Sequence, residues 1–157
     1  MNTTGRRQRG VVTIEYALML MFGLVPLLLF TFSGVLIMAA QQTLATASAE
    51  GARASLRFAS NDERRVAACE AARRSMQWLL EFSGQSPSCT GGGSGAIVVS
   101  AATPCTGLPA ASCITVTVSY DYRNHPFLPG TGRVYGWVMK DVIRSVAVAQ
   151  LDLGNSN

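Results

Sequence analysis

The stretch that decides the fold is RRQRGVVTIEYALMLMFGLVPLLLFTFSGVLIMAA, residues 6–40, in which a basic segment precedes a long apolar run. The only charged side chain between residues 11 and 40 is that of Glu15. Thirty residues of helix rise about 45 Å, whereas a bilayer core of about 30 Å needs only about 20 of them. The sequence therefore predicts one transmembrane helix that continues beyond the bilayer. Glu15 needs an explanation, because a carboxylate in the middle of such a helix costs about 2.5–3.5 kcal/mol.

The distribution of charge orients this helix. The chain has 13 Lys and Arg against 9 Asp and Glu, a formal net charge of +4. Three arginines, Arg6, Arg7 and Arg9, precede the apolar run, and the first ten residues contain no acid. The remainder therefore carries 10 minus 9, or +1. Basic residues on this flank favour a cytoplasmic N-terminus and an exported C-terminal part. We expect a membrane topology and no nucleic-acid partner.

Two ordinary interpretations of the apolar run compete. A cleavable secretory signal has an apolar region of about 7–15 residues, about half of what is present here. Ala47-Ser48-Ala49 nevertheless matches an A-x-A cleavage site. A plain signal anchor accounts for the length of the run. It does not explain why the helix carries Glu15, whose carboxylate is unfavourable in the bilayer.

A third interpretation comes from a resemblance. Gly10 followed by Val11-Val12-Thr13-Ile14-Glu15-Tyr16 resembles the processing site of type IV prepilins, where a basic leader ends in Gly and a Glu is fifth in the mature chain. The Glu-Tyr pair is similar to the Flp branch. The large part after the span resembles the TadE-like minor pilins (pseudopilins) of the tight-adherence (Tad) system. Further stretches similar to that family are Glu50-Gly51-Ala52-Arg53, Tyr120-Asp121-Tyr122 and Pro126-Phe127-Leu128-Pro129. One departure is that Met21 stands where the family has a proline.

The resemblance implies a structural, non-enzymatic role. A prepilin peptidase acting in trans would cleave between Gly10 and Val11, and the new α-amino group would lie one helical turn from Glu15. Glu15 of an incoming subunit would pair with the Val11 amine of a neighbour, and Tyr16 would belong to the same assembly surface. Two unit charges 4 Å apart attract by about 4 kcal/mol at an effective dielectric constant of 20, which offsets the burial of the carboxylate.

The implied partners are the major Flp pilin, a second minor pilin, the peptidase and an inner-membrane assembly platform. The chain would cross the inner membrane once, with a periplasmic C-terminal domain, and then enter a pilus that supports surface adherence. Two alternatives stay open. One is a permanently anchored periplasmic binding module that uses an aromatic surface, and the other is a type II secretion minor pseudopilin. The aromatic residues considered are Tyr120, Tyr122, Phe127, Tyr135 and Trp137.

The fold class predicted is α+β. We expect a basic leader at residues 1–10, a transmembrane and assembly helix at 11–59, and an exported domain at 60–157. Pro26 lacks an amide donor and predicts a helix kink. Ser60 and Glu63 have capping-box spacing and start an amphipathic helix that runs to Phe82. Alternating residues predict a main strand at 114–122, flanked by strands at 96–101 and 145–153, in a three-stranded antiparallel sheet covered on one face by a helix. Residues 134–143 are ambiguous.

Four cysteines, Cys69, Cys89, Cys105 and Cys113, all lie on the predicted exported side. An even number in an oxidising compartment favours two disulfides, with three possible connectivities. We favour Cys105–Cys113 and Cys69–Cys89, closing loops that would contribute about 2.5 and 3.5 kcal/mol. Zinc is disfavoured because no C-x-x-C spacing exists and His125 is the only histidine. The sequence offers no constellation for catalysis, and the glycine-rich segment at 83–95 lacks the Lys-Ser/Thr of a phosphate-binding loop. We expect no metal, cofactor or small-molecule substrate.

Overall fold

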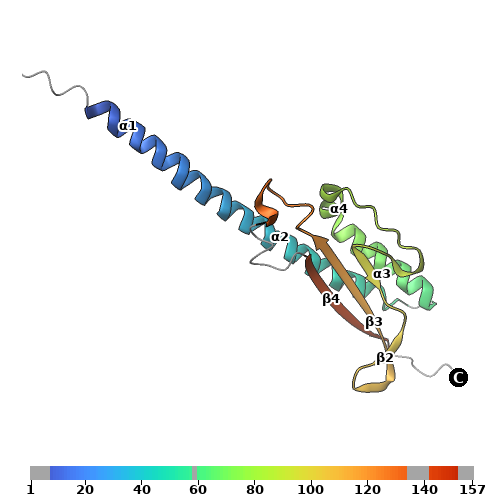
Figure 1. Ribbon diagram of the computed structural model, residues 1–157. Coiled ribbons are helices and arrows are strands. Elements are labelled where there is room, and N and C mark those ends of the chain that lie inside the picture. The colour runs from blue at the N-terminus through green and yellow to red at the C-terminus, as the bar shows by residue number, and fades with distance from the viewer. Residues whose placement is uncertain (1–7, 58–59, 134–141, 152–157) are drawn as a thin grey trace, which may run out of the picture. The chain divides into compact units, whose positions relative to one another are not determined.

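The computed structural model describes residues 8–57, 60–133 and 142–151 (Figure 1). The chain divides into two compact units, Met1–Ile37 and Met38–Asn157. Both contain part of one long helix, because the division falls inside α2 (Val25–Ala54). The architecture is α+β, as the sequence predicts: an apolar N-terminal helix, further helices and an antiparallel sheet.

The first unit is helical. It contains α1 (Gln8–Met19), a π-helical turn η1 (Leu20–Leu24) and the beginning of α2. Residues Val12–Ala54 form 43 residues of helix that are long and apolar enough to cross a membrane. Only 11% of the most apolar 18-residue window is buried, whereas the core helix of a soluble protein would be mostly buried. The helix therefore exposes an apolar surface that another phase or other helices must cover.

The helices of the second unit follow their sequence patterns with two differences. Ser60 is the N-cap of α3 (Asn61–Ser75), and the expected capping box with Glu63 is confirmed. Hydrogen bonds from the Ser60 side chain and then its backbone lower the pKa of Glu63. The helix expected to reach Phe82 is interrupted at Met76, whose φ is −110°, and continues as α4 (Gln77–Ser83). The long helix ends at Ala54 rather than near Ala59.

The sheet has four strands rather than the expected three. They are β1 (Ile97–Val99), β2 (Thr103–Cys105), β3 (Leu108–Asp121) and β4 (Val142–Leu151). Strand β3 pairs antiparallel with β4 from Ser112 to Asp121. Its other edge pairs with β1 and then with β2, also antiparallel. Strand β2 escaped prediction because it is short and contains Pro104, which an edge strand tolerates since one side of the strand needs no donor.

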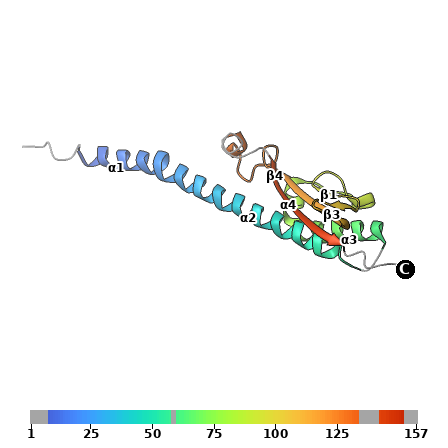
Figure 2. The same cartoon turned by 90° about the horizontal axis from the view of Figure 1, so that it is seen from below.

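The core lies between one face of the sheet and the helices. Side chains of β3 alternate as predicted, with Ile114, Val116, Val118 and Tyr120 buried. The C-terminal part of α2 lies along β3 and β4 (Figure 2), where the hydroxyls of Ser48 and Ser145 are 3.0 Å apart. Leu44 and Ala47 of α2 are fully buried. The small residues on this part of α2 allow the helix to approach its neighbours closely.

Both disulfides join the pairs favoured from the sequence. Cys69 of α3 is bonded to Cys89, with 5.5 Å between their Cα atoms, and Cys105 of β2 is bonded to Cys113 of β3 across 5.1 Å. Arg65 of α3 also binds the segment that follows Cys89. It donates hydrogen bonds to the carbonyl of Gly91 in the loop and to the carbonyl of Val99 in β1. The glycine-rich segment is therefore fixed to α3 at several points.

Gly51 gives a first test of this packing. A Cβ at residue 51 would lie 2.9 Å from Val116 Cγ1 and 3.0 Å from the carbonyl oxygen of Ala68. We expect Gly51→Ala to lower the free energy of unfolding of the domain by about 1–3 kcal/mol, because the backbone oxygen cannot move aside cheaply. Gly34→Ala is the control, since nothing lies within 4 Å of its Cβ position. Thermal unfolding of the full chain in detergent measures both; equal melting temperatures would contradict the close packing.

Candidate functional site

The residues of the predicted processing and assembly site all lie in α1. Gly10 and Val11 belong to its N-terminal part, and Glu15 and Tyr16 follow near its middle. Val11 and Glu15 are four residues apart, so one turn of helix separates them. The Glu15 side chain is exposed, and Tyr16 is 63% exposed. No ion pair joins Glu15 to another side chain that the structure describes. Because its side chain is exposed, the carboxylate is accessible to a charge from outside the chain.

The π-helical turn lies just before the proline predicted to kink the helix. In this turn the Val25 amide donates to the carbonyl of Leu20, five residues earlier. A regular α-helix would bring the ring of Pro26 against the carbonyl of Phe22, four residues back. The wider turn at Leu20–Leu24 is the kind of irregularity that relieves such a clash. It changes the angular relation between residues before and after it, and so sets which face Glu15 shares with α2.

The polar side chains within the apolar part of α2 need no external partner. The Thr31 hydroxyl donates to the carbonyl of Leu28, and the Ser33 hydroxyl donates to that of Leu29. Such bonds to the preceding turn satisfy hydroxyl groups in an apolar medium. The large apolar side chains around them are outward and exposed, among them Met19, Phe22, Leu27, Leu28 and Phe32. This surface suits lipid or the helices of other subunits.

Some of the aromatic residues that were considered as a binding surface belong to the hydrophobic core. Tyr120 and Tyr122 are 2% and 4% exposed, and both rings contact Phe127 with centroids 5.5 Å apart. The Tyr120 hydroxyl donates to the His125 carbonyl at 2.7 Å, and burial raises the pKa of Tyr120 to about 12. Tyr135 and Trp137 lie outside the described residues. Sequence reasoning missed Trp78 and Phe82, which also contact Phe127. Their i, i+4 spacing was the only available signal.

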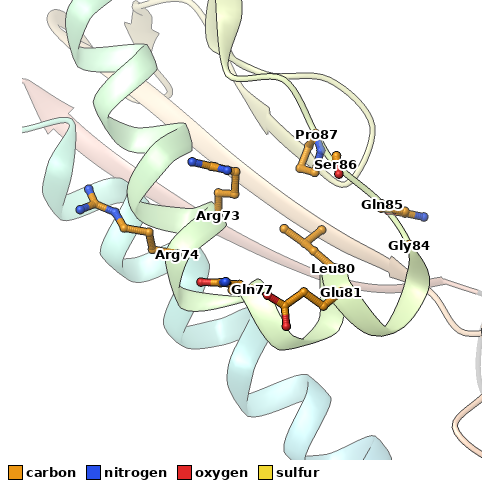
Figure 3. Close-up of a pocket in the computed structure, with 9 residues that line it drawn as sticks. All are labelled: Arg73, Arg74, Gln77, Leu80, Glu81, Gly84, Gln85, Ser86 and Pro87. Carbon is orange, nitrogen blue, oxygen red and sulfur yellow. Dashed lines mark hydrogen bonds between the residues drawn. The ribbon is translucent and has the colours of Figure 1, made fainter.

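The hollow shown in Figure 3 has a volume of about 450 Å³ and lies between α3 and α4 on one side and residues 84–87 on the other. Four of its charged and polar side chains bond to groups within the chain. Arg73 pairs with Glu70 at 2.7 Å, and Gln77 donates to Glu81 at the same distance. Arg74 donates to the carbonyl of Glu70. We assign no chemistry to this hollow.

Metal ions need sets of ligands such as His, Cys, Asp and Glu side chains. Among the residues that the structure describes, no group of three or more His, Cys, Asp or Glu residues is placed to hold a metal ion. All four cysteines are in disulfides. The backbone amide of His125 donates to the Asp121 carbonyl in the turn after β3.

No protein-family model, no curated protein and no solved structure matches this chain. The protein has a long apolar N-terminal helix packed, through its C-terminal part, on a small antiparallel sheet with two disulfides, which is a pilin-like arrangement. The candidate membrane helix and the disulfides suggest a membrane-anchored or extracytoplasmic protein.

The π-helical turn generates a prediction. In Pro26→Ala the ring clash disappears and residue 26 regains an amide donor, so we expect residues 20–25 to revert to a regular α-helix. Amide hydrogen exchange of the full chain in micelles should then slow at these positions by about tenfold or more. Leu27→Ala, one residue further on, should leave exchange unchanged. Equal exchange in the proline variant and the parent chain would show that Pro26 is not the cause of the turn.

Proposed function

We propose that this protein is a single-span structural subunit of a type IV pilus system, a TadE-like minor pilin of the Tad/Flp branch. The observation that carries the proposal is a lone carboxylate, Glu15, one turn from Val11 on an exposed apolar helix that runs on into a disulfide-bonded domain. A subunit that is first held in a membrane and then packed among like helices needs this combination. The aspartic prepilin peptidase that processes it acts in trans after Gly10.

The energetics favour pairing between subunits. A carboxylate at the centre of a membrane-spanning helix costs about 2.5–3.5 kcal/mol on insertion scales, which is an upper bound for Glu15 near one end of the apolar run. Its attraction to an α-amino group 4 Å away is worth about 4 kcal/mol at an effective dielectric constant of 20. The two magnitudes are comparable, so the pair offsets the burial of the carboxylate and can fix the axial register of a neighbour. Cleavage after Gly10 supplies that amine and removes the three arginines that precede the apolar run in the sequence.

The partners in this proposal are other pilins: the major Flp pilin, a second minor pilin, and the assembly platform of the inner membrane. The domain from residue 38 onward faces the periplasm and then the outside, where it initiates, caps or decorates the fibre and supports adherence. Two disulfides suit an oxidising compartment. A type II secretion minor pseudopilin would have the same design.

The competing proposal, a permanently anchored binding module, keeps only part of the aromatic surface expected for it. Tyr120 and Tyr122 are buried in the domain core, whereas Phe127 contacts the exposed rings of Trp78 and Phe82. The competing proposal also gives Glu15 no role. Processing separates the two proposals, since an anchor keeps its N-terminal segment and a pilin loses it.

We expect the protein isolated from its native host to begin at Val11. Intact mass spectrometry and N-terminal sequencing measure this directly. Gly10→Val should block cleavage, because a branched side chain then precedes the scissile bond, and the uncut chain should accumulate in the membrane. Gly5→Val is the matched control within the leader and should be cut normally. Fibres that contain the chain with Met1 still attached would refute the proposal.

Replacing Glu15 by Gln keeps its shape and removes its charge. We expect Glu15→Gln to be processed and inserted normally but to lower incorporation into pili by at least about tenfold, which corresponds to about 1.4 kcal/mol. Quantitative immunoblotting of sheared pili against membranes measures the ratio. Glu50→Gln is the control on the same helix, because Glu50 pairs with Arg53 within the chain. Normal piliation with Glu15→Gln would remove the assembly role.

A further inference from the structure

Helix α4 exposes aromatic side chains on one face. Trp78 and Phe82 are 41% and 51% exposed, and their i, i+4 spacing puts them side by side. The next two residues after Trp78, Leu79 and Leu80, are buried in the core. Phe127 contacts both exposed rings, with centroids 6.0 Å from Trp78 and 5.3 Å from Phe82. We call Trp78, Phe82 and Phe127 the aromatic patch.

The aromatic patch is hydrogen-bonded to α2. The indole N–H of Trp78 donates to the Thr43 hydroxyl at 3.2 Å, and that hydroxyl donates to the carbonyl of Ala39 at 2.9 Å. This chain of hydrogen bonds fixes the orientation of the indole. Stacking on Phe127 fixes its plane, since the two rings are inclined by only 24°. The exposed aromatic surface is therefore held in place rather than free to fold inward.

The hydrogen bond between Trp78 and Thr43 lies close to the end of the apolar run. Thr43 is the third residue after Ala40, and Gln41 and Gln42 are the first amide side chains after the run. The chain from α3 to Trp78, at the start of α4, runs antiparallel to the C-terminal part of α2, because Gly51 approaches Ala68 whereas Thr43 bonds to Trp78. Counted from Glu15, about 20 residues of hydrocarbon core and about 4–5 of headgroup layer end near residue 40.

We propose that the aromatic patch is an interfacial anchor that inserts into the lipid headgroup layer on the exported side of the membrane while the subunit awaits assembly. The proposal rests on the membrane residence in the proposed function. Aromatic side chains concentrate at membrane–water interfaces, where an apolar ring and a polar medium are both within reach. Next to water alone, the same surface would leave three apolar rings partly hydrated.

The chemistry of α4 specifies the lipid. The helix QWLLEFS contains no Lys or Arg, and Glu81 is its only charge. Helix α4 therefore offers no cation to anionic headgroups, and the cations nearest to Phe127 in the sequence, Arg123 and Arg133, lie outside the patch. A zwitterionic phosphatidylcholine or phosphatidylethanolamine surface suits the three apolar rings best. Contact with lipid should be insensitive to salt, because it depends on burial of apolar rings rather than on charge.

The test uses the full chain in phosphatidylcholine nanodiscs that contain a lipid with a spin label near the headgroup. Trp137→Phe leaves Trp78 as the sole tryptophan. We expect its fluorescence to be quenched about twofold or more relative to unlabelled discs, with no change on adding salt or anionic lipid. The matched control carries Trp137→Phe, Trp78→Phe and Leu56→Trp. Residue 56 is 55% exposed, lies beyond the far end of α2 and should not be quenched.

A second measurement avoids the substitution at residue 137. The unaltered chain is labelled with 5-fluorotryptophan, and the Trp78 resonance is assigned by its loss in Trp78→Phe. The spin-labelled lipid should broaden that resonance. A chain that inserts but shows no quenching or broadening of Trp78 overturns the anchor and leaves the proposed function intact. Protection of Trp78 that appears only when another pilin is added also overturns it and assigns the patch to a protein partner. A chain that fails to enter nanodiscs overturns the membrane step of the proposed function itself.

Discussion

One helix has to satisfy two different environments, and this constraint organises the whole molecule. Residues near Phe22 and Leu28 expose large apolar side chains, whereas Leu44, Ala47 and Gly51 are buried against the sheet and α3. Large side chains maximise contact with lipid or neighbouring helices, and small ones allow close approach of a sheet. The change from one composition to the other occurs along α2 without a break in the helix. The domain can therefore be built directly on the end of the element that carries it.

The sequence predicted the features that local chemistry determines. The capping box of Ser60 and Glu63 depends on two residues three positions apart, and the alternation of β3 depends on the period of a strand. The disulfide pairs followed from short loops, Cys105 with Cys113 and Cys69 with Cys89. In the candidate site, the one-turn separation of Val11 and Glu15 follows from spacing alone. Such features need little knowledge of distant contacts.

The features that escaped prediction depend on tertiary packing. Nothing at Met76 signals an interruption, since neither Gly nor Pro is present there, yet α3 and α4 meet at that residue. Strand β2 forms because the longer β3 offers it an edge beyond β1, in spite of Pro104. The rings of Trp78 and Phe82 gather on Phe127, which is far away in the sequence. The π-helical turn, Leu20–Leu24, is a response of the backbone to a proline that follows it, and spacing alone does not reveal the type of turn.

Both disulfides lie after residue 60, and each closes a short loop, because the bonded cysteines are separated by 20 and 8 positions in the sequence. Neither disulfide links the domain to the N-terminal helix. Formation of the disulfides therefore does not depend on where the N-terminal helix lies. In a chain that enters a membrane by its apolar helix, both disulfides can then form without any movement of that helix.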